Sequence, residues 1–351
     1  IRSKQPDAEL YYIGRKGGME ERLVPAAGIN FHGIEVSGFQ RQLNWENIKY
    51  NINAASQLAS ASRNARRLLL DIKPDVVMGT GGYVSGPVLR QAAKLGIKCC
   101  IHEQNAFAGV ANKMLAPKVD AVMLAMPDAE KYFKAKNKPI VTGNPVRESV
   151  INMTKQKARG ILGVDERPMI LSFGGSLGAR RINETVADVM AWHWKSGQIV
   201  HYHATGEYGV ELMPKLLAEK GVDLNCENIH ITEYIDNMDV MLAAADLVIC
   251  RSGAITISEL AVQGKPSVLI PSPNVAENHQ YHNAMTLVSR GAAAIVEEKD
   301  LTGEKLTQTV SELITDKARL EKMSQNAKKC AITDTNERIY RIIMKLYEST
   351  K

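Results

Sequence analysis

The sequence predicts an α/β protein with two domains, each built around a parallel sheet. Short apolar segments that are typical of buried strands alternate with helical segments along the 351 residues. Several of these strands run into glycine-rich turns that open a helix, most clearly at residues 169–190. A chain of this length is expected to form about two domains, because single cores stop growing at about 250–300 residues.

The segment at residues 169–190 is the first candidate for ligand binding. An apolar strand at 169–173 is followed by Gly-Gly-Ser-Leu-Gly at 174–178, and a helix starts near residue 179. Glycines let the backbone approach a ligand closely, and the N–H groups at a helix N-terminus attract an anion such as phosphate. No Gly-Lys-Ser/Thr follows, so the segment is not a P-loop. The alternative is a plain turn between a strand and a helix.

Composition limits the classes of function. The net charge of +6 suits anionic substrates or an anionic membrane surface, whereas scattered basic residues and an aromatic content of 5% argue against nucleic acid. The five cysteines form no Cys-x-x-Cys pair, so we expect reduced thiols in a cytosolic protein. No apolar run approaches 18 residues and no signal peptide is evident, so no membrane span is expected.

The N-terminal half is predicted to alternate between strands and helices. Residues 1–5 are typical of the end of a helix, so we expect the sequence to start inside its first βα unit or at a short helix of its own. Strands are predicted at 9–14, 73–80, 98–101, 121–125 and 139–142, and helices at 46–70, 88–95 and 110–115. Residues 81–87 are expected to form a glycine-rich loop between a strand and a helix.

Two basic segments are candidates for contact with anionic lipid. One carries Arg63, Arg66 and Arg67 near the end of the helix at 46–70, and the other covers the lysines of residues 131–138. An ordinary solvated surface explains both segments equally well.

Polar residues follow the strand at 98–101 in the sequence His102-Glu103-Gln104-Asn105. The carboxyl ends of strands are where open α/β sheets bind ligands, and a histidine beside a glutamate can exchange protons. The alternative is that local hydrogen bonds satisfy these side chains.

The second half is predicted to begin after Gly143, because Asn144-Pro145 is typical of a chain turn. Strands are predicted at 169–173, 198–204, 229–234, 246–250 and 267–270, and helices at 179–190, 255–263, 283–289 and from 316 with a break near 333–335. His201 and His203 share one face of a strand. No third ligand is evident, so packing or hydrogen bonding is favoured over a metal site.

Residues 251–259, Arg-Ser-Gly-Ala-Ile-Thr-Ile-Ser-Glu, form the more specific motif. Glu259 lies one turn inside a helix and can accept hydrogen bonds from the vicinal hydroxyls of a ribose, while Thr256 and backbone N–H groups can reach phosphate. A dinucleotide site places its acid at the end of the second strand, where this chain has Ala-Thr-Gly at 204–206. The pattern favours a nucleoside diphosphate held by two loops, and it disfavours an NAD oxidoreductase.

Five motifs occur in one order, at residues 81–87, 102–105, 143–147, 174–179 and 251–259. Together they closely resemble the MurG family of bacterial glycosyltransferases, over nearly the whole chain. The resemblance implies a GT-B fold, in which two Rossmann-like domains with parallel sheets face a cleft. Residues 1–143 would form the acceptor and membrane-side domain, 144–330 the UDP-GlcNAc-binding domain, and 331–351 a C-terminal helix that packs back on the first domain.

The resemblance implies an inverting transfer of N-acetylglucosamine (GlcNAc) from UDP-GlcNAc to the C4 hydroxyl of N-acetylmuramic acid in lipid I, an undecaprenyl-linked acceptor. The product would be lipid II for peptidoglycan synthesis. Peripheral association with the cytoplasmic face of the bacterial inner membrane follows from that acceptor. No metal or other cofactor is expected, and the sequence contains no Asp-x-Asp motif.

The same resemblance assigns the site residues. The donor-binding positions are Asn105, Arg147, Ser176, Ile235, Ala254, Ile255, Thr256, Ile257, Ser258, Glu259 and Gln280. The backbone of Ile235 would meet the uracil, Glu259 the ribose, and Ser176 with its loop amides the diphosphate. His102 and Glu103 would lie toward the acceptor and are the catalytic candidates.

Two features depart from the family. Leu177 stands where a glutamine is usual, so one polar contact of that loop is lost. The opening strand and its Gly-Gly-Thr-Gly-Gly-His loop, which carries the family's proposed general base, have no counterpart among these residues. The alternatives are therefore another GT-B enzyme of UDP-sugars, such as a UDP-GlcNAc 2-epimerase or a glycolipid glycosyltransferase, and a non-catalytic nucleotide-sugar binder.

Overall fold

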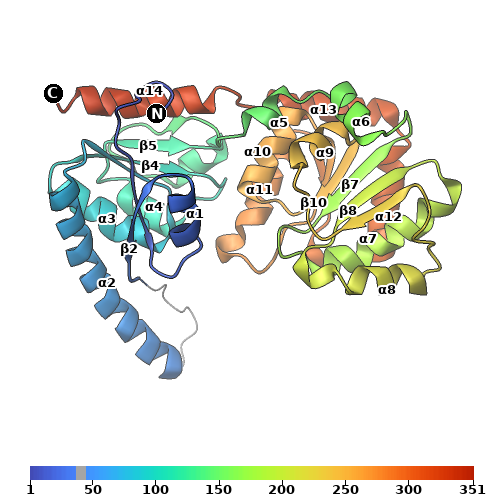
Figure 1. Cartoon of the computed structure of the whole chain (residues 1–351), viewed down its shortest axis with the longest axis horizontal. Helices are drawn as coiled ribbons and strands as arrows, with labels where there is room; N and C mark the ends of the chain where they lie inside the picture. Colours follow the sequence, from blue (N-terminus) through green and yellow to red (C-terminus); the bar gives the residue numbers. More distant parts are fainter. Residues whose placement is uncertain (37–44) are drawn as a thin grey trace. The chain divides into compact units, whose positions relative to one another are not determined.

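The computed structural model of the chain describes residues 1–36 and 45–351, with side chains described outside residues 37–56. The chain divides into two compact units (Figure 1). The N-terminal unit comprises Ile1–Gln104, Ala108–Thr142 and Asn336–Lys351, and the C-terminal unit comprises Asn105–Phe107 and Gly143–Thr335. Each unit is an α/β structure with parallel strands.

In its described residues, the N-terminal unit contains two parallel sheets. Its elements are β1 (Tyr11–Arg15), α1 (Glu20–Ala26), β2 (Asn30–Ile34), α2 (Trp45–Ile72), β3 (Val76–Gly79), α3 (Gly82–Lys94), β4 (Lys98–Glu103), α4 (Val110–Leu115), β5 (Ala121–Leu124), the 3-10 helix η1 (Pro127–Tyr132) and β6 (Ile140–Val141). One sheet is the pair β1-β2, and the other has the order β3-β4-β5-β6. The alternation of strand and helix gives parallel pairing, because each crossover helix returns the chain to the end of the sheet at which the previous strand began.

A cavity of about 500 Å³ lies between β1 and β3. Within the described part of the chain, β1 pairs only with β2 and β3 pairs only with β4, so each strand presents one unpaired edge. Both edges line the cavity, together with Leu69 and Ile72 of α2. With one parallel strand between β1 and β3, the order β2-β1-strand-β3-β4-β5 would be the doubly wound order 3-2-1-4-5-6. The strand in the cavity would then take the first place of that order.

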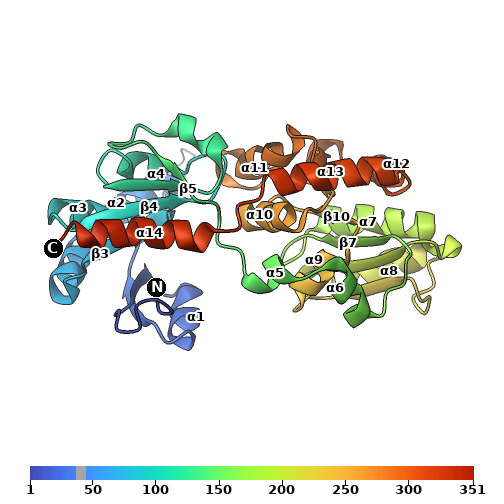
Figure 2. The same ribbon diagram turned by 90° about the horizontal axis from the view of Figure 1, so that it is seen from above.

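The C-terminal helix α14 (Thr335–Glu348) packs on the larger sheet of the N-terminal unit (Figure 2). Its apolar side chains Ile339, Ile342, Ile343 and Leu346 contact Cys100, Ala121 and Met123 of β4 and β5. Isoleucines spaced three and four residues apart lie on one helix face, which explains why this strongly amphipathic segment forms a helix and buries that face.

Several predicted boundaries in this unit were wrong. Residues 81–87 are not a loop, because α3 already begins at Gly82 and includes Pro87. A proline in the second turn costs one backbone hydrogen bond, and burial of Val88 and Leu89 offsets that loss. Residues 1–5 form a single turn, whereas α1 and β2 were missed within a segment whose glycines and polar residues resemble a loop.

The C-terminal unit is built from six strands. Its elements are α5 (Glu148–Asn152), α6 (Lys155–Leu162), β7 (Met169–Phe173), α7 (Arg180–His193), η2 (Trp194–Ser196), β8 (Val200–Ala204), η3 (Glu207–Gly209), α8 (Leu212–Glu219), β9 (Ile229–Thr232), α9 (Met238–Ala244), β10 (Leu247–Cys250), α10 (Ala254–Gln263), β11 (Ser267–Leu269), η4 (Ala276–Asn278), α11 (His279–Val288), β12 (Ala293–Ile295), η5 (Glu298–Asp300), α12 (Gly303–Ile314) and α13 (Lys317–Lys329).

The six strands form one parallel sheet with the order β9-β8-β7-β10-β11-β12. In sequence order this is 3-2-1-4-5-6, with the reversal of winding between β7 and β10. Helices α7, α8 and α12 cover one face of the sheet, and α9 and α10 lie on the other (Figure 1). Because both faces are covered, β7 and β10 are buried throughout, and all their residues except Ser172 are apolar.

Open α/β sheets bind ligands outside the carboxyl ends of the strands at the point where the winding reverses. In this unit that point lies between the loops that follow β7 and β10, where Phe173 pairs with Cys250. The fold therefore brings together the two motifs that the sequence singled out. Among the described residues, no helix has both the length and the apolar character needed to cross a bilayer.

Candidate functional site

The glycine loop after β7 is held by direct backbone contact with the loop after β8. Gly178 has φ = +83°, and the Gly178 N–H donates to the Gly175 carbonyl oxygen over 2.9 Å. A Cβ atom on Gly178 would overlap the Thr205 carbonyl oxygen, and a Cβ atom on Gly206 would overlap the Gly178 nitrogen. Only glycine fits at these two positions, both for space and for backbone angle.

This contact sets the position of the loop tip ahead of α7. Ser176 and Leu177 are exposed at the tip, and the first turn of α7 follows directly. The N-terminus of a 14-residue helix offers unpaired N–H groups and a partial positive charge. The loop can therefore bind an anionic group through backbone amides, with the Ser176 hydroxyl beside them.

Two amide side chains of α11 form hydrogen bonds with the loop after β10, and one of them also bonds to the loop after β11. The Gln280 Oε1 atom accepts hydrogen bonds from the backbone N–H groups of Ser252 (3.3 Å) and Ser272 (2.9 Å). The Asn283 Nδ2 group donates to the Ser252 carbonyl oxygen over 3.2 Å. These contacts fix the turn that opens α10, and the Ser252 hydroxyl inside it is buried without a hydrogen-bond partner in the described chain.

Glu259 lies on α10 with its carboxylate in a mostly buried position. Its side chain is 13% exposed, and the Arg147 Nη2 atom lies 3.9 Å from Glu259 Oε1. Burial raises the pKa of Glu259, while the charge of Arg147 acts in the opposite direction. With its one cation 3.9 Å away, the Glu259 carboxylate retains acceptor capacity for hydroxyl donors.

The motif at 143–147 is joined to the same helix. The Asn144 Nδ2 group donates to the Ala254 carbonyl oxygen (3.2 Å) and to the Ser258 Oγ atom (3.1 Å). Arg147 is 58% exposed at its side chain, so it is available to a ligand as well as to Glu259. These contacts hold Asn144 and Arg147 against α10, so the motif at 143–147 and the motif at 251–259 belong to one site.

The remaining predicted donor residues lie in the C-terminal unit with different exposures. Ile255 is exposed, Ala254, Thr256 and Ser258 are half-buried, and Ile257 and Ile235 are buried. Only the backbones of the two buried isoleucines can meet a ligand. Asn105 accepts a hydrogen bond from Asn283 Nδ2 over 3.1 Å, which fixes residues 105–107 in this unit.

His102 and Glu103 lie in the N-terminal unit as the last two residues of β4, where both side chains are 2% exposed. The Glu103 Oε2 atom accepts from the Gly109 N–H and from the Asn112 Nδ2 group, each over 2.9 Å. Because Gly109 is the N-cap residue of α4, Glu103 compensates the unpaired amides at that helix start. Their catalytic role stays a prediction.

Sequence reasoning missed the residues that shape the loop before α11. Glu277 (φ = +55°) and Asn278 (φ = +51°) are consecutive non-glycine residues in the left-handed region. Such conformations cost energy and cluster at ligand-binding loops. Asparagine tolerates the left-handed region, so Asn278 could be suspected there. No sequence signal predicts that a glutamate such as Glu277 adopts a positive φ angle.

A chain of buried hydrogen bonds supports the glycine loop from inside the sheet. His193 Nε2 lies 3.1 Å from His201 Nδ1, and Ser172 Oγ lies 2.8 Å from both His201 Nε2 and His203 Nδ1. His203 Nε2 lies 3.1 Å from Asn183 Oδ1, and Asn183 Nδ2 donates to the Thr205 carbonyl oxygen over 3.0 Å.

The amide of Asn183 fixes the direction of every proton in this chain. Since Asn183 Oδ1 can only accept, His203 donates from Nε2 and accepts at Nδ1 from the Ser172 hydroxyl. Ser172 then accepts from His201, which in turn accepts from His193. The chain ends at the carbonyl that contacts Gly178, so it orients the wall of the glycine loop. His201 and His203 have the hydrogen-bonding role that the sequence favoured.

Comparison with known proteins identifies the family. The chain matches the glycosyltransferase family 28 N-terminal domain over residues 2–124 and the glycosyltransferase family 28 C-terminal domain over residues 169–339. The chain belongs to glycosyltransferase family 28. Its two units have the GT-B fold of that family, as the resemblance of the motifs predicted.

Curated relatives of this family cover almost the whole chain. Proteins from Ruminiclostridium cellulolyticum (45% identity; 99% of this chain, 93% of the relative) and Acetivibrio thermocellus (43% identity; 98% and 91%) are named UDP-N-acetylglucosamine–N-acetylmuramyl-(pentapeptide) pyrophosphoryl-undecaprenol N-acetylglucosamine transferase. The crystal structure of Acinetobacter baumannii MurG aligns with a TM-score of 0.78 at 28% identity, covering 98% of this chain and 93% of that one.

A more distant structure shares the fold alone. The UDP-GlcNAc 2-epimerase from Neisseria meningitidis bound to UDP-GlcNAc aligns with a TM-score of 0.61 at 14% identity, over 96% of this chain and 91% of that one.

Substituting Gly178 tests the contact between the two loops. We expect Gly178→Ala to weaken binding of UDP at least tenfold, because the new methyl group overlaps Thr205 and the φ of +83° is strained for alanine. Isothermal titration calorimetry with UDP measures the effect. Gly160→Ala is the matched control, since a Cβ atom there meets nothing within 4 Å. Equal UDP affinity for both variants would remove the contact from the site.

The buried histidines predict a loss of stability in mild acid. Burial lowers the pKa of His193 and His203 to about 4 and holds that of His201 well below its ordinary value. In the unfolded chain these groups bind protons below about pH 6.5, whereas the folded chain does not, so acid favours unfolding. Each histidine contributes up to about 1.4 kcal/mol per pH unit between pH 6.5 and 4. Urea unfolding at pH 7.5 and pH 5 checks this, and equal stability at both would contradict it.

Proposed function

We propose that this chain transfers GlcNAc from UDP-GlcNAc to the C4 hydroxyl of N-acetylmuramic acid in lipid I, which yields lipid II. The main support is the reversal point of the C-terminal sheet, because the Gly174–Gly178 loop and the turn that opens α10 follow the two neighbouring strands β7 and β10. Near-full-length relatives at 43–45% identity carry the name of this activity. The proposal assigns the donor to the C-terminal unit and the acceptor to the N-terminal unit.

The donor would lie across the loops that follow β7 and β10, with each part of the donor bound by a distinct group. The loop amides after β7, Ser176 and the start of α7 would hold the diphosphate, and Glu259 would accept from the ribose hydroxyls. The backbone of Ile235 would meet the uracil, and Gln280 would keep the loops after β10 and β11 at a fixed separation. The other donor contacts are proposed at Asn105, Arg147 and residues 254–258.

The transfer would be a single inversion at the anomeric carbon. The acceptor C4 oxygen forms the new bond while the bond to the β-phosphate oxygen breaks, and UDP leaves with the electron pair. Amide N–H groups and Arg147 would stabilise the negative charge that develops on the diphosphate. A base takes the hydroxyl proton, and His102 and Glu103 remain the candidates of the N-terminal unit.

Association with the membrane surface is part of the proposal because the acceptor is lipid-linked. On α2, Ala61, Ala65 and Leu69 are buried, so Arg63, Arg66 and Arg67 lie on the exposed side. The lysines of residues 131–138 begin in the last turn of η1 and form the second basic segment. Both segments could bind anionic lipid at the cytoplasmic face of the inner membrane.

The cavity between β1 and β3 bears on the activity of the N-terminal unit. A parallel strand placed there would join the two sheets into the doubly wound order, and its loop would open at the reversal point of that sheet. We therefore propose that full acceptor binding needs a strand in this cavity, followed by a glycine-rich loop.

Glu259→Ala tests the donor site. We expect UDP binding to weaken by about 1–3 kcal/mol, roughly 5- to 150-fold, because a carboxylate that accepts ribose hydroxyls is lost. Folding should be retained, since burial raises the pKa of this carboxyl and its charge does not stabilise the fold. Calorimetry with UDP gives the affinity, and Glu304→Ala on the exposed side of α12 is the control. Unchanged affinity would exclude Glu259 from the site.

The proposed charge stabilisation predicts little dependence of the chemical step on metal ions. Amide donors of this kind are worth roughly 3–4 kcal/mol each, and no Asp-x-Asp motif occurs in the sequence. We expect turnover of UDP-GlcNAc and lipid I to change by less than about twofold in excess EDTA. Thermal unfolding in EDTA serves as the control. Complete loss of turnover with unchanged folding would refute this mechanism.

A further inference from the structure

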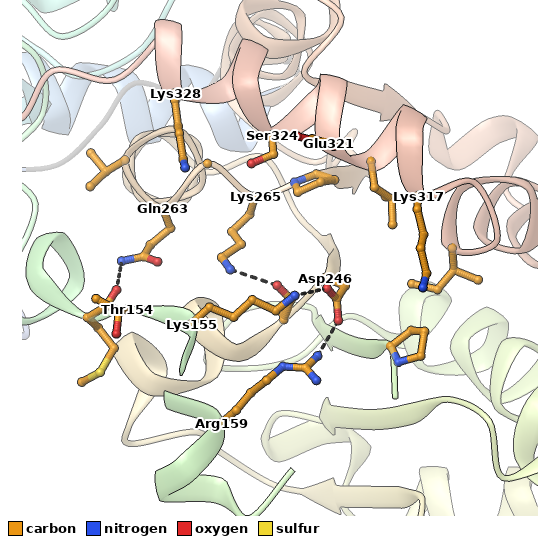
Figure 3. Close-up of a pocket in the computed structure, with 18 of the residues that line it drawn as sticks. Thr154, Lys155, Arg159, Asp246, Gln263, Lys265, Lys317, Glu321, Ser324 and Lys328 are labelled. Carbon is orange, nitrogen blue, oxygen red and sulfur yellow. Dashed lines mark hydrogen bonds and ion pairs between the residues drawn. The ribbon is translucent and has the colours of Figure 1, made fainter. Parts of the chain in front are cut away.

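A second cavity lies at the amino edge of the C-terminal sheet, opposite the edge that carries the glycine loop (Figure 3). Its volume is about 690 Å³. The lining comes from the connection between α5 and α6, the residues that precede β7, β10 and β11, and one side of α13. None of the lining residues is among the proposed donor-binding positions, although Val262 and Gln263 belong to the helix α10 whose first residues are.

Basic side chains outnumber acidic ones in this cavity. The basic residues are Lys155, Arg159, Lys265, Lys317 and Lys328, and the acidic residues are Glu166, Asp246 and Glu321. They converge from α6, from the residues that precede β7, β10 and β11, and from α13, as Figure 3 shows for most of them. The cavity therefore has an excess of positive charge that its own carboxylates do not balance.

Asp246 and Arg159 form a fixed floor. Asp246 Oδ2 accepts from the Met169 N–H (2.9 Å) and pairs with Arg159 Nη2 (2.5 Å), while Lys155 pairs with Asp246 Oδ1. Arg159 also donates from Nε to the Ala244 carbonyl oxygen over 3.2 Å. The Asp246 carboxylate is thus fully occupied by one backbone N–H group and two cationic side chains.

Lys265 is the buried cation of the cavity. It is 6% exposed, and its Nζ atom donates to the carbonyl oxygens of Ala243 (2.7 Å) and Ala245 (2.9 Å) at the end of α9. An ammonium group has a third donor beyond these two bonds. Burial lowers the pKa of Lys265 to about 7, with Lys155, Arg159 and Lys328 adding to this effect and Asp246 opposing it.

Lys317 and Lys328 supply the outer wall from α13. Both side chains are exposed, and neither forms an ion pair with any described residue. The stem of Lys328 lies against Gly264, where a Cβ atom would overlap it, so the glycine leaves room for this lysine. The hydroxyl of Ser324 lies on the same side of α13.

We propose that this cavity binds a small phosphate-bearing anion of diphosphate size, held by Lys317, Lys328 and the buried Lys265. A phosphate-bearing dianion balances the excess charge, and its three or more acceptor oxygens can accept hydrogen bonds from three lysines at once. The inference is independent of the proposed function, because it uses the opposite edge of the sheet.

Titration of the full chain with inorganic pyrophosphate tests the proposal. The titration is done in saturating UDP, so that any phosphate contacts of the glycine loop are occupied. We expect saturable binding that the Lys317→Ala/Lys328→Ala double variant weakens about tenfold or more. Lys299→Ala, an exposed lysine outside the cavity, is the matched control and should leave the affinity unchanged.

Proton uptake gives a second readout that a nonspecific surface charge would not produce. A bound anion raises the affinity of Lys265 for its proton, so pyrophosphate binding near pH 7.5 should take up protons, measured by calorimetry in buffers of different ionisation enthalpy. Lys265→Met should remove the uptake. Absence of saturable binding, or equal affinity in the double variant and the control, would overturn the proposal.

A lipid headgroup presents the same phosphate chemistry as a soluble compound. Sedimentation with phosphatidylglycerol vesicles separates the two sources. Vesicle binding that falls in the double variant assigns the site to a headgroup, and pyrophosphate binding without such a change assigns it to a soluble ligand. Either result supports the phosphate site.

Discussion

The C-terminal unit depends on one close approach between two backbones. The loop after β7 touches the loop after β8 at Gly178, Thr205 and Gly206, with no side chain between them. This contact brings the start of α7 to the reversal point of the sheet, and the buried chain from His193 to Asn183 holds the Thr205 carbonyl in place. The anion-binding geometry of the loop is a consequence of a packing constraint that only glycine satisfies.

At the two ends of the strands of this sheet, positive charge comes from different groups. At the carboxyl ends of the strands, helices α7 and α10 begin, so the amide groups of their first turns attract anions there. At the amino edge, α9 ends and exposes carbonyl oxygens, which Lys265 and Arg159 satisfy with positive charge. This sheet thus has positive charge at both ends of its strands, from backbone dipoles at the carboxyl ends and from Lys265 and Arg159 at the amino ends.

Sequence patterns predicted most of the elements that carry the site. The strands at 169–173 and 246–250 and the helix ended by Gly264 could be predicted because apolar runs and glycine stops are local signals. The helix that contains Pro87 could not, since tertiary burial overrides the local preference of proline. The same limit applies to the site, because Asn283, Ser252 and the strained Glu277 gain their roles from contacts between distant segments.

The separation of β1 from β3 in the N-terminal unit has a consequence for main-chain hydrogen bonding at their cavity. An unpaired strand edge is a template for any extended backbone, and soluble proteins usually blunt such edges with charge, proline or a covering helix. Here β1 and β3 offer two parallel edges to one cavity. An extended segment placed in this cavity would therefore find main-chain partners on both of its sides, whereas a segment added beside β9 or β12, the outer strands of the C-terminal sheet, would find them on one side only.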